Sequence, residues 1–94
     1  MQNNSKKQVK KPLNKVRVEF DNIQRIYAAL PRYSLAEIAE EVNVDYQAVY
    51  ACFTRISRKK SYDRAIIEAA VRKLNSVGNL ISLKDIELPE PSKN

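Results

Sequence analysis

Two short amphipathic segments joined by three residues constrain the fold of this chain more than any other feature. The stretch "SLAEIAEEVNVDYQAVYACF" covers residues 34–53. In its first half, apolar residues recur at the spacing of one helical face: Leu35, Ile38, Ala39 and Val42. Asn43 suits the left-handed conformation that ends a helix, and Asp45 suits the N-cap of the next helix. The spacing predicts two helices with a tight turn between them.

The second of these helices is expected to have one buried face and one exposed face. The buried face would comprise Ala48, Val49, Cys52 and Phe53. The residues directed outward would be Tyr46, Gln47, Tyr50, Ala51, Thr54 and Arg55. At the start of the first helix, Ser34 and Glu37 fit a capping box, in which the serine oxygen accepts a hydrogen bond from the amide of Glu37.

Two further segments show the same helical spacing. Residues 21–30 have Asp21 or Asn22 as a candidate cap and end before Pro31. Residues 63–75 form the other segment. Its expected inward side chains are Ile66, Ile67, Ala70, Val71 and Leu74.

Apolar and polar residues alternate over residues 16–20 and again within 80–88, which is the pattern of a half-buried strand. We therefore expect an all-α fold of four helices, with a tri-helical core and a minor two-stranded β element made from these two segments. Residues 16–88 would form the domain, residues 1–15 a flexible basic arm and residues 89–94 a disordered tail.

Composition narrows the classes of function. The chain has 94 residues, one glycine, one cysteine and no histidine. These counts argue against a glycine-rich phosphate loop, a Cys–His nucleophile pair and a metal-ligand cluster, so we expect no enzyme activity and no cofactor. Cys52 is expected to be a small buried hydrophobe. No apolar run approaches the roughly 20 residues that span a bilayer. With no secretory signal seen, we expect a protein of the prokaryotic cytoplasm or nucleoid without membrane contact.

The positive charge is unevenly distributed along the chain. The net charge is +6, from 17 Lys/Arg and 11 Asp/Glu. Residues 1–20 contain six Lys/Arg and one Glu, whereas residues 61–94 contain five residues of each sign. A second excess, "RISRKK" at residues 55–60, directly follows the second helix of the pair. Basic segments beside a neutral domain often bind nucleic acid. The side chains expected to contact phosphates here are Arg55, Arg58, Lys59 and Lys60.

Two short helices, a tight turn and a following basic segment are typical of a helix-turn-helix, whose second helix enters the major groove of DNA. Gln47 carries the carboxamide that bonds an adenine edge with two hydrogen bonds. Tyr46 and Tyr50 can contact thymine methyl groups, bases or phosphates. The expected base contacts are therefore Tyr46, Gln47, Tyr50 and the neighbouring Ala51.

The segments "SLAEIAEEVNVDYQAVYACFTR" and "AIIEAAVRKLN" resemble the DNA-binding headpiece of the lactose-repressor family. That headpiece has a small polar cap, Leu, an acidic residue and Ile/Val-Ala, then a Gly-Val-Ser turn, Val and Ser-Arg-Val-Leu-Asn, and a third helix. Residues 34–79, about half of the chain, align with it without gaps. The resemblance implies base contacts from Tyr46, Gln47 and the position of Ala51. It also implies that Ser34, Thr54 and Arg58 lie near phosphates.

The chain departs from the headpiece pattern at several positions. Asn43 stands where the family has glycine, and Asp45 stands where it has Ser or Thr. Tyr50 and Ala51 replace Ser-Arg, so a base-reading arginine is missing. No hinge helix or sugar-binding core follows Asn79, so no small-molecule effector is expected. The helix at 21–30 has no counterpart in the family.

Together these features predict a sequence-specific double-stranded DNA-binding protein. We expect a small transcriptional repressor, acting as a homodimer on a two-fold operator with half-sites about one helical turn apart. Residues 80–88 or 21–30 would supply the dimer surface. One alternative is a protein-interaction adaptor or inhibitor that reuses the fold, because tyrosine is also favoured in protein interfaces. Another is an architectural DNA-binding protein without a regulatory role.

Overall fold

The structure is a computed structural model that describes residues 14–89. The expected arm (1–15) and tail (89–94) fall almost wholly outside the described residues. In chain order the elements are β2 (Lys15–Arg17), α1 (Phe20–Ala29), α2 (Ser34–Val42), α3 (Tyr46–Thr54), β3 (Ser61–Asp63), α4 (Arg64–Ser76) and α5 (Leu83–Ile86). The expected small, mainly helical fold with a minor β element is confirmed.

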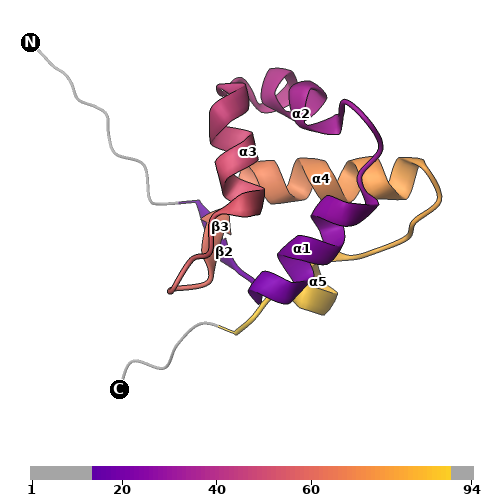
Figure 1. Ribbon diagram of the computed structural model, residues 1–94. Helices are drawn as coiled ribbons and strands as arrows, with labels where there is room; N and C mark the ends of the chain where they lie inside the picture. The colour runs from indigo at the N-terminus through magenta and orange to yellow at the C-terminus, as the bar shows by residue number, and fades with distance from the viewer. Residues whose placement is uncertain (1–13, 90–94) are drawn as a thin grey trace, which may run out of the picture.

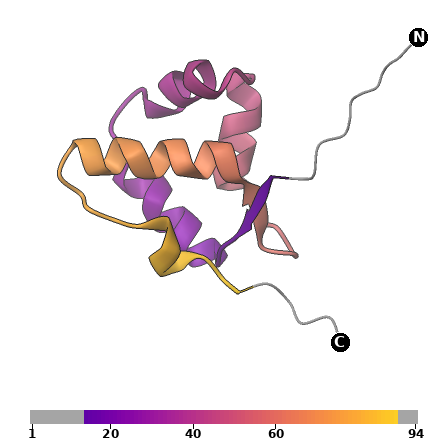
Figure 2. The same ribbon diagram turned by 180° about the vertical axis from the view of Figure 1, so that it is seen from behind.

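Helix α4 runs across the middle of the molecule and the other helices lie around it (Figures 1 and 2). In both views α2 lies on one side of α4, and α1 and α5 lie on the other. Helix α3 stands beside the N-terminal end of α4, next to the two strands. Helices α2, α3 and α4 therefore make up the expected tri-helical group, with α1 packed against α3 and α4.

The turn between α2 and α3 is as tight as the sequence predicts. Asn43 has the left-handed conformation, with φ 60° and ψ 51°, and its amide donates to the carbonyls of Ala39 and Glu40. Asp45 stands at the N-cap position of α3, but its side chain makes no capping hydrogen bond. Only three residues separate the two helices, because Asn43 adopts a backbone conformation that few residues other than glycine tolerate.

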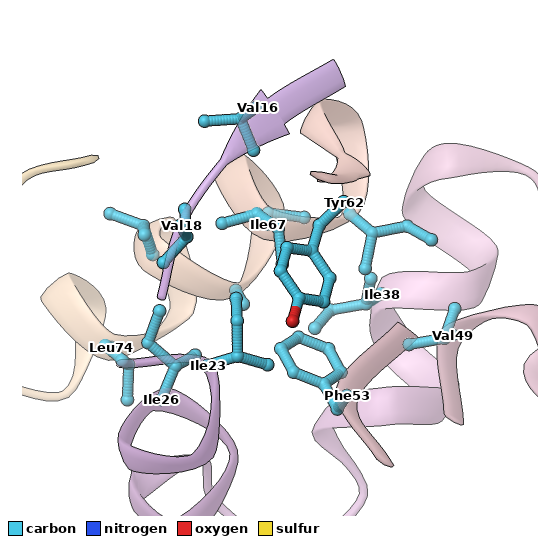
Figure 3. Close-up of a cluster of buried hydrophobic side chains, with 14 of the residues drawn as sticks. Val16, Val18, Ile23, Ile26, Ile38, Val49, Phe53, Tyr62, Ile67 and Leu74 are labelled. Atoms are coloured by element: carbon cyan, nitrogen blue, oxygen red, sulfur yellow. The ribbon is translucent and has the colours of Figure 1, made fainter. Parts of the chain in front are cut away.

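The hydrophobic core gathers side chains from every helix except α5 and from both strands (Figure 3). Phe53 of α3 is fully buried, and its ring stacks on Tyr27 of α1 with the centroids 5.8 Å apart. The side chain of Gln24 donates to the backbone carbonyl of Phe53 at 2.8 Å. Helix α1, which the headpiece pattern lacks, therefore buttresses the inner side of α3. It begins at Phe20 with Glu19 at the N-cap, so neither Asp21 nor Asn22 caps it.

The β element exists, but the expected partner of its first strand was wrong. Strand β2 pairs antiparallel with β3, and Val16 lies opposite Tyr62. Both of these side chains are buried. Residues 80–88 contribute one isolated bridge between Val18 and Glu87, and four of them form α5. The "SYD" stretch of β3 is too short for its alternation to be recognised before the fold brings it beside β2.

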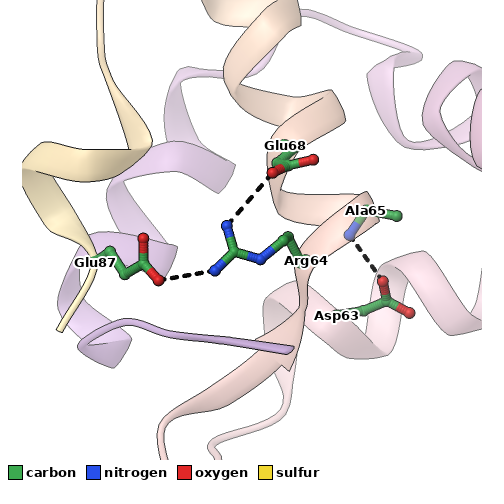
Figure 4. Close-up of polar contacts among 5 residues, drawn as sticks. All are labelled: Asp63, Arg64, Ala65, Glu68 and Glu87. Atoms are coloured by element: carbon green, nitrogen blue, oxygen red, sulfur yellow. Dashed lines mark hydrogen bonds and ion pairs between the residues drawn. The ribbon is translucent and has the colours of Figure 1, made fainter. Parts of the chain in front are cut away.

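Hydrogen bonds and apolar contacts hold residues 80–88 against the rest of the domain. Arg64 at the start of α4 donates to Glu87 at 2.8 Å and to Glu68 at 3.5 Å (Figure 4). These hydrogen bonds raise the pKa of the Arg64 guanidinium. Asn75 exchanges two hydrogen bonds with the backbone of Ile81. The apolar side chains of this segment that pack against the core are Ile81, Leu83 and Ile86.

Candidate nucleic-acid interface

The outer face of α3 presents aromatic and amide groups to solvent. Tyr46 is 48% exposed and Tyr50 is 43% exposed, and their rings stack with centroids 6.4 Å apart. Gln47 is exposed beside them. Because Tyr46 and Tyr50 are four residues apart on one helix, their stacked rings form a continuous aromatic surface about one helical turn long. The outward direction predicted for all three residues is confirmed.

The flank of α3 nearest the strands differs from the prediction. Ala48, expected in the core, is exposed, and Ala51, expected outside, is half-buried. Both line a depression of about 370 Å³ between α3, the loop 55–60 and β3. Ala48 is exposed because it faces this open depression rather than the core. Ala51 thus lines this depression and is also a candidate base contact.

Cys52 lines the same depression. Burial raises the pKa of its thiol to about 11, so the neutral thiol is the form present near neutral pH. The side chain is half-buried and packs against the core, as a small hydrophobe does. The expected inward position of Cys52 is confirmed.

The basic loop after α3 is a folded turn. The amide of Lys60 donates to the carbonyl of Ser57 at 3.1 Å, which leaves Arg58 and Lys59 at the corners of the turn. Arg55, Arg58 and Lys59 are exposed, and none of them has an ion-pair partner within residues 14–89. Lys60 differs, because its ammonium pairs with Glu19 at 3.0 Å. Three of the four expected cations of the loop, Arg55, Arg58 and Lys59, are therefore available to bind a ligand.

Two other expected backbone contacts have contrasting surroundings. Thr54 is exposed at the end of α3, where its hydroxyl donates to the carbonyl of Tyr50 at 2.9 Å. Ser34 is only 2% exposed, and its hydroxyl has no hydrogen-bond partner among residues 14–89. The residue at the N-cap of α2 is Tyr33, whose carbonyl accepts from the amide of Glu37. The expected capping box and phosphate contact of Ser34 were therefore wrong: the helix starts one position earlier than the pattern implied, and this turns the hydroxyl into the protein.

Replacing Ser34 with alanine tests this geometry by the sign of its effect. We expect the free energy of unfolding to rise by up to about 1 kcal/mol, since the change removes an unpaired buried hydroxyl and introduces a better helix former. A capping serine would instead lose about 1 kcal/mol. Asp63→Ala is the matched control, because the Asp63 carboxylate does cap α4 by accepting from the amide of Ala65 at 3.0 Å. Urea denaturation should show opposite signs for the two variants, and a loss in both would contradict the burial of Ser34.

The sequence did not predict three exposed side chains, those of Arg32, Tyr33 and Ile56. Tyr33 occupies the left-handed region with φ 70°, and the guanidinium of Arg32 lies 6.0 Å from its ring centroid. Tyr33 and Tyr46 line the same two depressions beside α2. Ile56 is exposed in the basic loop. Periodicity cannot identify such residues, because each of them stands outside a helix; for Tyr33 the only available signal was its position just before Ser34.

The acidic residues of α2 are partly neutralised by α4. Glu37 pairs with Lys73 at 2.6 Å, and Glu41 pairs with Arg72. Glu40 has no ion-pair partner within the described part of the chain. Exposed pairs of this kind contribute little to stability. They do lower the net negative charge beside the Tyr46–Tyr50 surface.

Comparison of this chain with known protein families, with curated proteins and with solved structures finds no match. Between residues 14 and 89, no helix combines the length and apolar character needed to cross a membrane. Over the same residues, no cluster of three or more His, Cys, Asp or Glu side chains could hold a metal ion.

Proposed function

We propose that the protein binds double-stranded DNA in a sequence-specific way and acts as a small transcriptional repressor. The observation that carries this proposal is that α3 exposes Tyr46, Gln47 and Tyr50. The loop that follows this helix presents three cations without an ion-pair partner within residues 14–89. An α-helix with its side chains is about 10–12 Å in diameter, so α3 fits a major groove about 12 Å wide. Base edges would meet the α3 surface, and phosphates would meet the loop.

The roles follow from the chemistry of each side chain. Gln47 would donate to and accept from an adenine edge, and the Tyr46 and Tyr50 rings would cover thymine methyl groups. Arg55 and Arg58, together with Lys59, would bind phosphates and set the register of the helix on the duplex. Lys60 would contribute less, because Glu19 already neutralises it. Ser34 has no part in this assignment.

A single headpiece-sized surface reads few base pairs, so useful specificity favours a homodimer on a two-fold site. The apolar side chains of residues 80–88 are largely used within the chain, but Leu80 is 80% exposed and Val77 is exposed beside it. These two lie in the connection after α4, on the opposite side of the molecule from α3 in Figure 1. A dimer formed there would leave the α3 surface free.

Replacing Leu80 with aspartate should abolish such a dimer, because it places a charge at the centre of an apolar contact. Sedimentation of the full chain at micromolar concentration would report a monomer for Leu80→Asp and a dimer for Leu80→Met, the matched control. A dimer that persists in Leu80→Asp would place the interface elsewhere. A monomeric parent protein would contradict the homodimer.

The function itself is tested by selection of random duplex DNA with the purified protein, followed by sequencing at two salt concentrations. An enriched inverted repeat is the expected result. Retention without a motif, lost at higher salt, would indicate architectural binding instead. No retention at low salt would contradict DNA binding altogether.

A second candidate function is that of a protein-interaction adaptor. It is favoured by the aromatic surface that Tyr33 adds to Tyr46 and Tyr50, since exposed tyrosines are enriched at protein interfaces. The variants Tyr33→Ala and Gln47→Ala separate the two functions. DNA recognition should depend mainly on Gln47, whereas binding of a protein to the tyrosine surface should depend mainly on Tyr33.

A further inference from the structure

Ile56 is 71% exposed although it lines the depression between α3 and β3. A single exposed aliphatic side chain is ordinary on a protein surface. The setting of this one is unusual, because it directly follows Arg55 and directly precedes the turn that presents Arg58 and Lys59. The loop therefore presents one apolar side chain with cations on both sides.

The charge around Ile56 complements a polyanion. Arg55, Arg58 and Lys59 have no acidic partner within residues 14–89, and Lys15 lines the same depression. The one carboxylate that lines the depression, that of Asp63, is engaged at the N-terminus of α4. Closely spaced positive charges with few negative ones nearby match the phosphates of the two strands that flank a DNA groove.

The backbone of this loop is held in place before any ligand binds. The amide of Arg55 donates to Ala51 at 2.9 Å, and the amide of Val18 donates to the carbonyl of Lys60 at 2.8 Å. Between these two anchors, the turn is closed by the hydrogen bond from Lys60 to Ser57. A loop ordered in this way loses less entropy on binding than a flexible one does.

The loop also lies at the right place beside α3. Figures 1 and 2 show that it projects from the body of the molecule next to the two strands, where α3 ends. If the N-terminal residues of α3 contact base edges in a major groove, the loop at the other end of the helix lies toward the phosphates that border this groove. Beyond these phosphates lies the neighbouring minor groove.

We propose that Ile56 enters the minor groove beside the α3 site and acts as an apolar wedge that bends the duplex, while Arg58 and Lys59 bind the flanking phosphates. Proteins that bind the minor groove often place an aliphatic side chain between base steps and kink the duplex by about 20–90°. This inference rests on the proposed DNA-binding function. Insertion of Ile56 adds a second contact site on the duplex. It also adds specificity for flexible base steps that α3 does not touch.

The test measures bending and affinity separately. A duplex that carries the selected site is labelled with a fluorophore at each end, and energy transfer reports the end-to-end distance at saturating full-length protein. We expect Ile56→Ala and Ile56→Gln to abolish the shortening and to weaken binding about tenfold. Ile56→Leu should keep both the shortening and the affinity, because leucine retains the apolar wedge. In parallel, Arg58→Gln should lower the slope of log affinity against log salt by about one.

The results separate this inference from the function on which it rests. Circular dichroism should show that all the Ile56 variants are folded, since the side chain is exposed. If the parent protein binds its site but leaves the duplex straight, or if Ile56→Ala bends it equally, the wedge is overturned and the function stands. If the parent protein binds no duplex, both are overturned. Capture of a protein through Ile56 without any DNA bend would also overturn the wedge.

Discussion

Replacing Phe53 with alanine is expected to lower the free energy of unfolding by about 3–5 kcal/mol. The ring is fully buried, stacks on Tyr27 and lies close to Ile38 and Tyr62 in the core (Figure 3). The change would leave a cavity between α1 and α3, and the fixed helices around it could close it only in part. A domain of this size lies near the lower end of the range of about 5–15 kcal/mol that is typical of proteins, so this loss should remove most of its stability.

Urea denaturation followed by circular dichroism measures this loss. Phe53→Leu keeps most of the volume and should lose less than about 1.5 kcal/mol. Gln47→Ala serves as the surface control on the same helix and should change stability by less than about 0.5 kcal/mol. A loss below about 1 kcal/mol for Phe53→Ala would mean that α1 does not pack on α3 as described.

The second large effect is expected in DNA recognition. Gln47→Ala should weaken binding to the selected site by about 1–3 kcal/mol, or roughly 5- to 150-fold, because it removes two hydrogen bonds to one base. Binding to a scrambled duplex should hardly change, because phosphate contacts carry no sequence information. Fluorescence anisotropy with the two duplexes measures both values.

Arg58→Ala is the matched comparison for Gln47→Ala. It should weaken binding to the selected and scrambled duplexes alike and reduce the salt dependence. If Gln47→Ala also weakened both duplexes equally, Gln47 would not read a base, and the resemblance of α3 to a lactose-repressor recognition helix would lose its main support.

Much of the local structure could be predicted because it depends on neighbouring residues. The faces of α1, α2 and α4 follow from apolar spacing, and the turn after α2 follows from the ability of Asn43 to adopt a left-handed conformation. Of the candidate interface, the outward direction of Tyr46, Gln47 and Tyr50 was predicted in the same way. A helix of known start and period directs each side chain by geometry alone.

Predictions that depended on a helix end or a distant partner were less accurate. Ser34 looked like a cap, but one residue of difference in the start of α2 buried its hydroxyl. Lys60 looked like a free cation, but Glu19 lies 3.0 Å from it across 41 positions of the chain. Ala48 and Ala51 differ from the prediction because both face the depression between α3 and β3.

The sequence by itself determined helices α1 to α4, the tight turn and the polar side chains of α3, because periodicity and capping act over a few residues. Only the tertiary structure decided that β2 pairs with β3 and that Arg64 forms an ion pair with Glu87. It also decided that Ile56 is exposed among cations that have no ion-pair partner in the described part of the chain. Each of these arrangements joins segments far apart in the chain or depends on what the rest of the fold leaves uncovered. Burial and pairing at such positions are set by the packing of the whole domain, so no local pattern encodes them.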